Sequence, residues 1–211
     1  MKDSVQNELP SDKSIAVKSP IHELLKKRWS PLAFSDQPVE AEKLCSVLEA
    51  ARLTASSYNE QPWSFIIATQ DNLDDFNRLL SCLAAGNQEW AKHVPVLMLS
   101  VTRLHFEKNG AENRHAFHDV RAAATSLAIH AIALGLFVHQ MAGFDVSKAC
   151  VIYHIAEGFE PVAAIAPGYR GDSHSLSKEL QQREASPCSC KPLDSFVFSG
   201  SWNQPFPWMT G

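Results

Sequence analysis

The stretch "ASSYNEQPWSFIIAT", residues 55–69, joins a polar loop to an apolar strand. Residues 64–69 form a short apolar run rich in β-forming side chains and bounded by turn residues, which predicts a buried strand. The preceding residues 40–53 have apolar positions in helical register. The polar loop at 56–63 therefore lies between a helix and the mouth of a sheet, where ligand-binding loops are common. Taken alone, it also fits an ordinary connection with Trp63 in the core.

The composition is that of an ordinary globular protein. The chain has 211 residues, of which 45% are hydrophobic and 20% charged, which predicts one domain with short appendages. The formal net charge is −4 and the chain has no long basic run, so nucleic acid and anionic membranes are not favoured partners. We also find no apolar stretch long enough to span a bilayer.

The chain ends and the cysteines indicate a reducing, cytoplasmic setting. Residues 1–19 are polar and lack the apolar core of a signal peptide, so we expect a flexible N-terminal arm. The number of cysteines, five, is odd and they have no framework spacing, which suits a reducing cytoplasm. Cys188 and Cys190 form a C-x-C pair, but no second half of a zinc site accompanies it, and we interpret it as a surface pair.

Hydrophobic periodicity predicts alternating helices and strands. Asn72 and Asp145 are candidate N-caps, and Gly86 and Gly135 are candidate helix ends. Residues 171–190 are polar and are expected to form a loop. From the residues alone the fold class is α/β or α+β. The helices are expected at 20–28, 40–53, 72–86, 113–134 and 146–155, and the strands at 64–69, 94–101, 136–141 and 161–169.

Two segments point to contacts beyond a simple core. The predicted helix at 113–134 is apolar over much of its surface, which indicates a position in the core or in a subunit interface. The C-terminal residues carry aromatic side chains that are expected to pack on something, such as a partner subunit. These aromatic residues are Phe196, Phe198, Trp202, Phe206 and Trp208.

An ordered set of motifs resembles the nitroreductase family of FMN-dependent oxidoreductases over about residues 21–198. The motifs are "KRWSPLAF" (27–34), "PVEAEKLCSVLEAARLTASSYNEQPWSFII" (38–67), "HDVRAAATSLAIHAIALGL" with "HQMAGFD" (within 118–145), "EGFEPVAAIAPGYRGD" (157–172) and "KPLDSFVF" (191–198). Each motif alone is weak, and their order is what makes the resemblance specific.

The resemblance implies an α+β, three-layer fold with a central mixed, mainly antiparallel β-sheet flanked by helices. It also implies an intertwined homodimer with two FMN sites between the subunits. The single FMN-binding domain would then cover residues 20–198, and the aromatic tail at 199–211 would pack on the dimer.

The resemblance also assigns site residues. Arg28 and Ser30 of the R-x-S motif, with Trp29 between them, would hold the FMN phosphate, and a guanidinium binds phosphate bidentately. Met141 would cover a flavin face, while the backbone of Ala142 and Gly143 would approach flavin N5. The remaining cofactor contacts would come from Ser56, Ser57 and Asn59, against the isoalloxazine of the partner's flavin, and from Lys191.

The chain departs from the family pattern at two places. Many members carry a basic residue near flavin N1 and O2 where this chain has Leu32, and loss of that cation lowers the flavin potential unless another positive group compensates. Relatives also tend to have arginines before "KPL", where this chain has Cys188 and Cys190. Weaker FMN binding is therefore one expectation. Trp90 and Lys92 match family contacts with the pyrimidine edge of the flavin only loosely, and Trp90 fits core packing equally well.

The implied activity is hydride transfer from NADH or NADPH through flavin N5 to a small electron acceptor such as a nitroaromatic or a quinone. Such an enzyme shows ping-pong kinetics and needs no catalytic side chain and no metal, because the cofactor supplies the chemistry. The loop at 103–117, with His105, Phe106 and Phe117, is a candidate lining for the acceptor pocket.

Three alternatives remain open. The first is a flavin-binding or flavin-free relative that acts as a binding protein, which the changes at Leu32 and the two cysteines would suit. The second keeps the fold but changes the chemistry, as in relatives that reductively dehalogenate or that fragment flavin. The third is a metalloenzyme, because His115, His118 and Asp119 stand at i, i+3 and i+4 of one predicted helix.

Overall fold

The computed structural model of the chain describes residue 17 and residues 19–209. The predicted N-terminal arm at 1–19 therefore lies almost entirely outside the described residues. The chain divides into two units: a compact unit over His22–Ala185, and a second unit formed by the terminal stretches. Apart from Lys191, every predicted cofactor-binding residue belongs to the compact unit.

The compact unit is built on one four-stranded sheet with the order β1-β2-β4-β3. The strands are β1 (Trp63–Thr69), β2 (Val96–Arg103), β3 (Phe137–Met141) and β4 (Phe159–Gly168), so each of the four predicted strands is confirmed. All three pairings are antiparallel, so the sheet of the described residues is antiparallel throughout rather than mixed.

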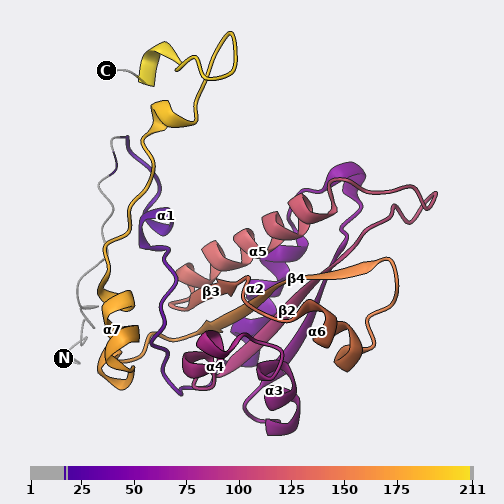
Figure 1. The fold of residues 1–211 in the computed structure, drawn as a ribbon, viewed down its shortest axis with the longest axis vertical. Coiled ribbons are helices and arrows are strands. Elements are labelled where there is room, and N and C mark those ends of the chain that lie inside the picture. The colour runs from indigo at the N-terminus through magenta and orange to yellow at the C-terminus, as the bar shows by residue number, and fades with distance from the viewer. Residues whose placement is uncertain (1–16, 18, 210–211) are drawn as a thin grey trace, which may run out of the picture. The chain divides into compact units, whose positions relative to one another are not determined.

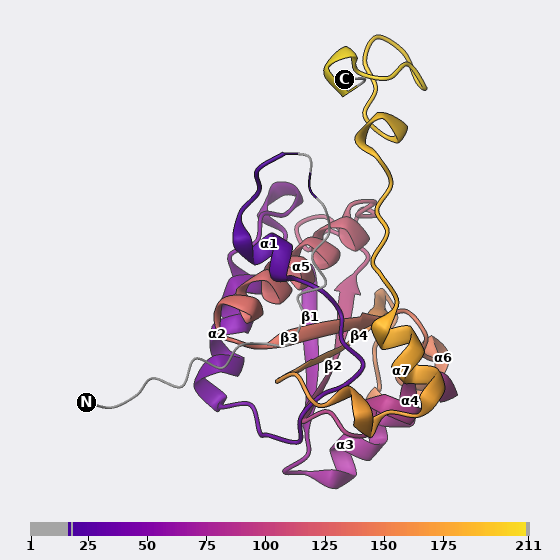
Figure 2. The same cartoon turned by 90° about the vertical axis from the view of Figure 1, so that its left-hand side faces the viewer.

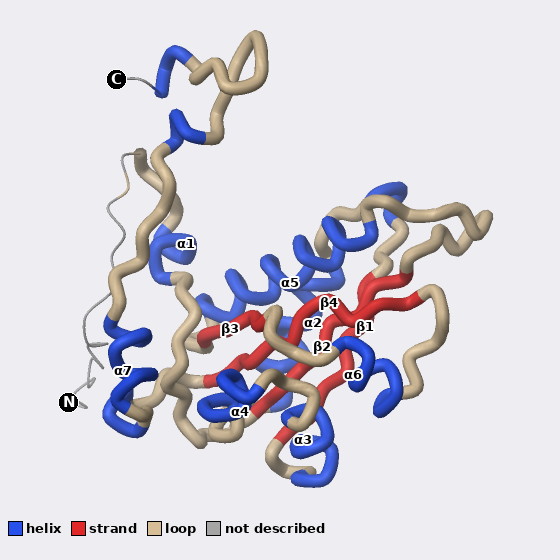
Figure 3. Tube along the Cα trace, viewed as in Figure 1, coloured by secondary structure: helices blue, strands red, loops and turns tan. Residues whose placement is uncertain are grey.

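Helices cover both faces of this sheet (Figures 1 and 3). Helices α2 and α5 lie on one face, and α3, α4 and α6 lie on the other; the turned view in Figure 2 shows the same separation. The three-layer α+β arrangement is therefore confirmed. The helices are α1 (Glu23–Lys27), α2 (Ala41–Arg52), α3 (Leu73–Leu80), α4 (Ala85–Ala91), α5 (Ala116–Ala133), α6 (Val146–Tyr153) and α7 (Lys178–Ala185).

Strand β2 supplies side chains to both cores. Leu97 and Leu99 point to the core under α3, α4 and α6, whereas Val96 and Met98 point to the core under α2 and α5. Because successive side chains of a strand alternate between faces, a strand that is apolar at every position must be covered on both sides. The prediction that this strand is buried on both faces is confirmed, and so is the burial of the long helix α5, whose alanines pack on α2.

The predicted helix at 72–86 is wrong, because two helices occupy this region. Asn72 caps α3 as predicted, by accepting a hydrogen bond from the N–H of Asp75. However, α3 ends at Leu80, and Gly86 lies inside α4 instead of ending a helix. Tertiary contacts interrupt the helical pattern: Cys82 O accepts the N–H of Asp145, and residues 83 and 144 form an isolated β-bridge. Asp145 also caps α6 as predicted.

The loop expected at 171–190 contains helix α7, which sequence periodicity did not reveal. The helix is polar apart from Leu180 and Ala185, so its hydrophobic pattern is weak. Its two buried residues, Leu180 and Glu184, are spaced i, i+4 and therefore face the same side. Because one of these two residues is a glutamate, the buried face of the helix lacks the hydrophobic periodicity that usually identifies a core-facing helix.

The C-terminal unit contains a small hairpin-like turn. Phe198 and Pro205 form an isolated β-bridge, and the rings of Phe198 and Trp202 lie 5.3 Å apart. Within the chain these aromatic contacts are local, because Trp202 and Trp208 remain more than 80% exposed. Their predicted packing on a partner subunit stays a prediction.

Gly171 lets the segment before α2 approach the end of β4. Its N–H donates to Ala33 O at 3.0 Å, and Ser35 N–H donates to Tyr169 O at 2.9 Å. A Cβ atom at Gly171 would lie 2.4 Å from the carbonyl carbon and oxygen of Phe34. Backbone atoms cannot move aside cheaply, so this crossing requires glycine.

We expect Gly171→Ala to lower the free energy of unfolding by roughly 1–3 kcal/mol, because a methyl group would be forced into backbone atoms. Urea denaturation measures this change. Gly86→Ala is the matched control: a Cβ at Gly86 meets nothing within 4 Å, and replacing a helical glycine by alanine stabilises by about 0.5–1 kcal/mol. Equal behaviour of the two variants would contradict the close approach at Gly171.

Candidate functional site

The segment at 29–34 crosses the end of the sheet beside β3 and β4. Its backbone is anchored at Pro31, whose carbonyl oxygen lies 2.7 Å from His139 Nδ1 on β3. A carbonyl can only accept, so His139 Nδ1 carries the hydrogen. Trp29 packs edge-on against Phe137 at a ring distance of 6.1 Å, and the Arg170 guanidinium lies 5.1 Å from the centre of the Trp29 ring. The R-x-S motif is therefore held at the start of β3.

Two polar side chains of this motif are available to a ligand. Arg28 is the C-cap residue of α1 and is half-buried, and Ser30 is exposed. Neither side chain makes a hydrogen bond or an ion pair with any residue in the described part of the chain. A half-buried guanidinium and an exposed hydroxyl two residues apart in sequence are donors of the kind that suits a phosphate.

The segment Ala142–Gly143 follows the opposite end of β3. Gly143 O accepts two hydrogen bonds at 2.9 Å, from Ala84 N–H and from the Asn87 amide. The N–H groups of Ala142 and Gly143 donate to none of the described residues. The segment is thus held through the carbonyl oxygen of Gly143, while its N–H groups are left for a ligand or solvent. Asn87, which the sequence did not single out, is the side chain that fixes it.

Two predicted contacts differ from expectation. The side chains of Leu32 and Met141 are only 5% and 3% exposed, and both belong to the core under α3, α4 and α6. Met141 therefore has little surface with which to cover a flavin face. The core position of Leu32 also means that a cation cannot be placed there without burying it, which is costly. Contacts from these two positions would have to come from the backbone.

The loop before β1 has an unusual backbone. Tyr58, Asn59 and Gln61 adopt positive φ angles of 53°, 57° and 49°. Such left-handed conformations are strained for residues other than glycine and cluster at functional sites. Ser56 Oγ supports the loop by accepting the N–H of Gln61 at 2.9 Å.

Buried Asp119 holds the same loop from α5. Its Oδ2 accepts the N–H of Ser57 at 2.9 Å, and its side chain is almost fully buried. The sequence singled out Asp119 only as a metal ligand. His118 Nδ1 lies 3.2 Å from Asp119 Oδ1, and across the described ranges no group of three His, Cys, Asp or Glu side chains could hold a metal ion. The ligand set that the metalloenzyme alternative requires is not assembled there.

A second loop lies against the first. Tyr58 is 92% exposed, and its ring contacts Phe106 edge-on at 5.9 Å. Arg103 bridges the two loops, because its guanidinium bonds to Glu60 at 2.9 Å and to Glu107 at 3.2 Å. The predicted acceptor loop thus lies next to the predicted flavin-facing loop, with an aromatic pair at their meeting point.

One chain does not bring the two halves of the predicted site together. The loop at 56–61 precedes β1, which forms one edge of the sheet, while Ala142 and Gly143 follow β3 at the other edge. Strands β2 and β4 lie between them, and Met141 is level with Ile66 across these two strands. Within one chain, the loop at 56–61 and the segment Ala142–Gly143 therefore lie at opposite edges of the sheet.

The remaining predicted residues lie apart from these groups. Trp90 is buried, stacked on Phe34 at 5.9 Å and tilted against His139 at 4.6 Å, so it is a core residue. Lys92 lines a cavity instead. Lys191 belongs to the C-terminal unit, and its role in phosphate binding stays a prediction.

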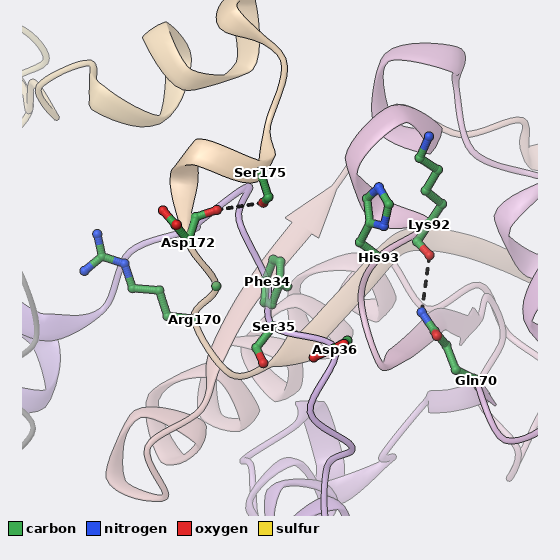
Figure 4. Close-up of a pocket in the computed structure, with 10 residues that line it drawn as sticks. Phe34, Ser35, Asp36, Gln70, Lys92, His93, Arg170, Asp172 and Ser175 are labelled. Carbon is green, nitrogen blue, oxygen red and sulfur yellow. Dashed lines mark hydrogen bonds between the residues drawn. The ribbon is translucent and has the colours of Figure 1, made fainter.

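A cavity of about 500 Å³ opens at the end of the sheet where β1 and β4 finish (Figure 4). Phe34 lies between its two sides, with Lys92 and His93 on one side and Arg170 and Asp172 on the other. None of the predicted cofactor residues lines it.

Comparison with known proteins decides the family. The family model described as "Nitroreductase family" matches residues 25–169. The chain belongs to the nitroreductase family. This nitroreductase family member is similar to a solved oxidoreductase that contains FMN, with 32% sequence identity and a TM-score of 0.86. The similarity covers 93% of this chain and 99% of the solved oxidoreductase.

The chain is also similar to two further proteins. A nitroreductase family protein of Clostridium difficile 630 has the same fold, with 22% identity, a TM-score of 0.66 and coverage of 85% of this chain and 97% of its own. An uncharacterised 15.4 kDa protein of Mycolicibacterium smegmatis is 34% identical over 92 residues, which are 44% of this chain and 62% of that relative. The described part of this family member has no helix long and apolar enough to cross a membrane.

Stability is expected to depend on the protonation of His139. Burial lowers the pKa of His139 below its usual 6.5, and the charge of Arg183 lowers it further, against the bond to Pro31. Below pH 6.5 the unfolded chain therefore binds a proton that the folded chain resists. In this range the free energy of unfolding should therefore decrease as the pH is lowered. The contribution of His139 to this decrease is at most about 1.4 kcal/mol per pH unit. Urea titrations between pH 5 and 8 should show a shallower slope for His139→Gln than for the native chain; identical slopes would contradict this assignment.

We expect Asp119→Ala to release the loop before β1, because it leaves the Ser57 N–H without its acceptor. The variant should lose about 1–3 kcal/mol of stability and exchange the Ser57 amide hydrogen faster, as measured by NMR. Asp119→Asn, which keeps an acceptor oxygen, should retain most of the protection. His118→Ala serves as the control, since that side chain is 83% exposed. If the Ser57 amide exchanged faster in His118→Ala but not in Asp119→Ala, the start of α5 and not the Asp119 carboxylate would hold the loop.

Proposed function

We propose that this protein is an FMN-dependent oxidoreductase that passes hydride from NADH or NADPH to a small acceptor such as a nitroaromatic or a quinone. The observation that carries the proposal is the similarity to an FMN-containing oxidoreductase over nearly the whole of both chains, at 32% identity. Membership of the nitroreductase family supports the same class. When bound, FMN supplies the hydride chemistry at N5, so no catalytic side chain is assigned.

The residues at the start and end of β3 fit this cofactor. Arg28 and Ser30 carry side-chain donors that no described residue uses, which suits the FMN phosphate. At the other end of the strand, the open N–H groups of Ala142 and Gly143 suit an acceptor atom of the ring system. A five-residue strand spans roughly 13–17 Å. The donors at the two ends of β3 are therefore far enough apart to bind the two ends of an extended ligand.

The proposal includes a homodimer. Ser56, Ser57 and Asn59 lie at the opposite sheet edge from Gly143, so they would serve the flavin bound by the partner. The exposed pair Tyr58 and Phe106 would then lie at the mouth of the partner's site. An aromatic pair there would favour flat acceptors, because stacked and edge-on ring contacts are favourable.

The alternative of a flavin-free binding protein rests on specific changes in this chain. Leu32 occupies the place of a family cation and is a core residue, and Cys188 and Cys190 replace basic residues before "KPL". The visible absorption spectrum of the freshly purified protein, with flavin quantified after denaturation, separates the two functions. Near one FMN per chain, reduced by NADH or NADPH and reoxidised by an acceptor, supports the oxidoreductase. A colourless protein that takes up no added FMN supports the binding protein.

We expect Arg28→Ala to raise the FMN dissociation constant about 10- to 100-fold, because a charge-assisted hydrogen bond contributes about 1.5–3 kcal/mol. Fluorescence titration of FMN measures the change. Lys27→Ala is the matched control, since Lys27 is the exposed neighbouring cation in the last turn of α1, and its affinity should stay within about threefold. Equal losses in both variants would indicate general charge attraction and would remove Arg28 from the site.

A further inference from the structure

Glu184 is a buried carboxylate in the last turn of α7 that reaches the R-x-S segment from the far end of the chain. It is 6% exposed, and its Oε2 accepts the N–H of Leu32 at 2.7 Å, although the two residues are 152 positions apart in sequence. Its Oε1 is also buried and has no hydrogen-bond partner in the structure as described. None of the motifs that carry the family resemblance includes this residue, and the family match ends at residue 169.

Stability alone does not explain a glutamate at this position. An acidic side chain in the last turn of a helix opposes the helix dipole. Burying a carboxylate with one oxygen unpaired costs further free energy. Leu180, one turn earlier on the same face, shows that an apolar side chain fits this surface. Such local conflicts are expected where a residue serves a site.

The bond to Leu32 completes a row of three consecutive anchors. Pro31 O bonds to His139, Leu32 N–H bonds to Glu184, and Ala33 O bonds to the N–H of Gly171. The anchors come from β3, from α7 and from the end of β4. They follow directly after Arg28 and Ser30, whose side chains are unpaired in the described structure.

We propose that Glu184 is a positioning residue: through the Leu32 amide it holds the segment 28–32 so that Arg28 and Ser30 meet the phosphate of FMN. This inference rests on the proposed function. It makes α7 part of the cofactor site and not a surface addition. It also predicts that the effect of Glu184 depends on the phosphate, because the flavin ring is not what Arg28 and Ser30 bind.

The first test compares FMN with riboflavin, which lacks the phosphate. Glu184→Ala should raise the FMN dissociation constant about tenfold or more, while riboflavin binding changes less than about threefold. Glu184→Gln keeps an oxygen for the Leu32 N–H and should rescue most of the affinity. Glu179→Ala, at an exposed position on the same helix, is the control and should bind both flavins as the native chain does. Equal losses for FMN and riboflavin, or no loss, would overturn the proposal.

The second test is a double-mutant cycle. If Glu184 acts by placing Arg28, then Glu184→Ala should cost little FMN affinity in an Arg28→Ala background. Additive losses would mean that the two residues act independently, which contradicts positioning. Should Glu184→Ala fail to fold, Glu184→Asp replaces it, because the shorter side chain withdraws the carboxylate from Leu32 at constant charge and should show the same phosphate-dependent loss.

Amide exchange at Leu32 separates failure of this inference from failure of the proposed function. Without cofactor, the Leu32 amide should exchange faster in Glu184→Ala than in the native chain and in Glu184→Gln, as measured by hydrogen exchange. A native chain that binds no FMN but shows this pattern overturns the function and keeps the anchor. A native chain that binds FMN while Leu32 exchange is the same in all variants overturns the role of Glu184.

Discussion

The burial of β2 on both faces is the constraint on which the rest of the structure depends. Its alternating side chains belong to two separate cores, so helices must cover both sides of the sheet. This leaves the strand ends and the outer edges β1 and β3 for function. The candidate cofactor groups lie there: on the segment beside β3, on the peptide after β3 and on the loop before β1.

At these edges the fold positions backbone more than side chains. Asn87 and Ala84 hold the carbonyl of Gly143, Asp119 holds the N–H of Ser57, and Glu184 holds the N–H of Leu32. In each case a group from another element of the fold fixes one peptide of a candidate cofactor-binding segment. Sites built in this way rely on donors and acceptors set in place before the ligand arrives.

Patterns local to one segment could be predicted from the sequence. The four strands follow from apolar runs bounded by turn residues, and the caps at Asn72 and Asp145 follow from side-chain acceptors. The end of α5 follows from Gly135, which adopts a positive φ. The break at 81–84 could not be predicted, because contacts with residues 143–145 cause it. The roles of Asp119, Asn87 and Glu184 could not be predicted either, because each side chain holds a distant segment through one long-range hydrogen bond. Such a bond leaves no periodic pattern in the sequence. Helix α7 was missed because one of its two buried residues is Glu184. The core positions of Leu32 and Met141 likewise depend on which face the folded segment presents.

The left-handed residues of the loop before β1 have a consequence for evolution and engineering. Each such residue stores on the order of 1–3 kcal/mol of conformational strain, and Tyr58, Asn59 and Gln61 follow one another closely. Substituting glycine there would relax the backbone of the chain, but it would also let the loop leave the conformation that it now holds. Selection for higher conformational stability and selection for this loop conformation therefore favour different residues at the same positions.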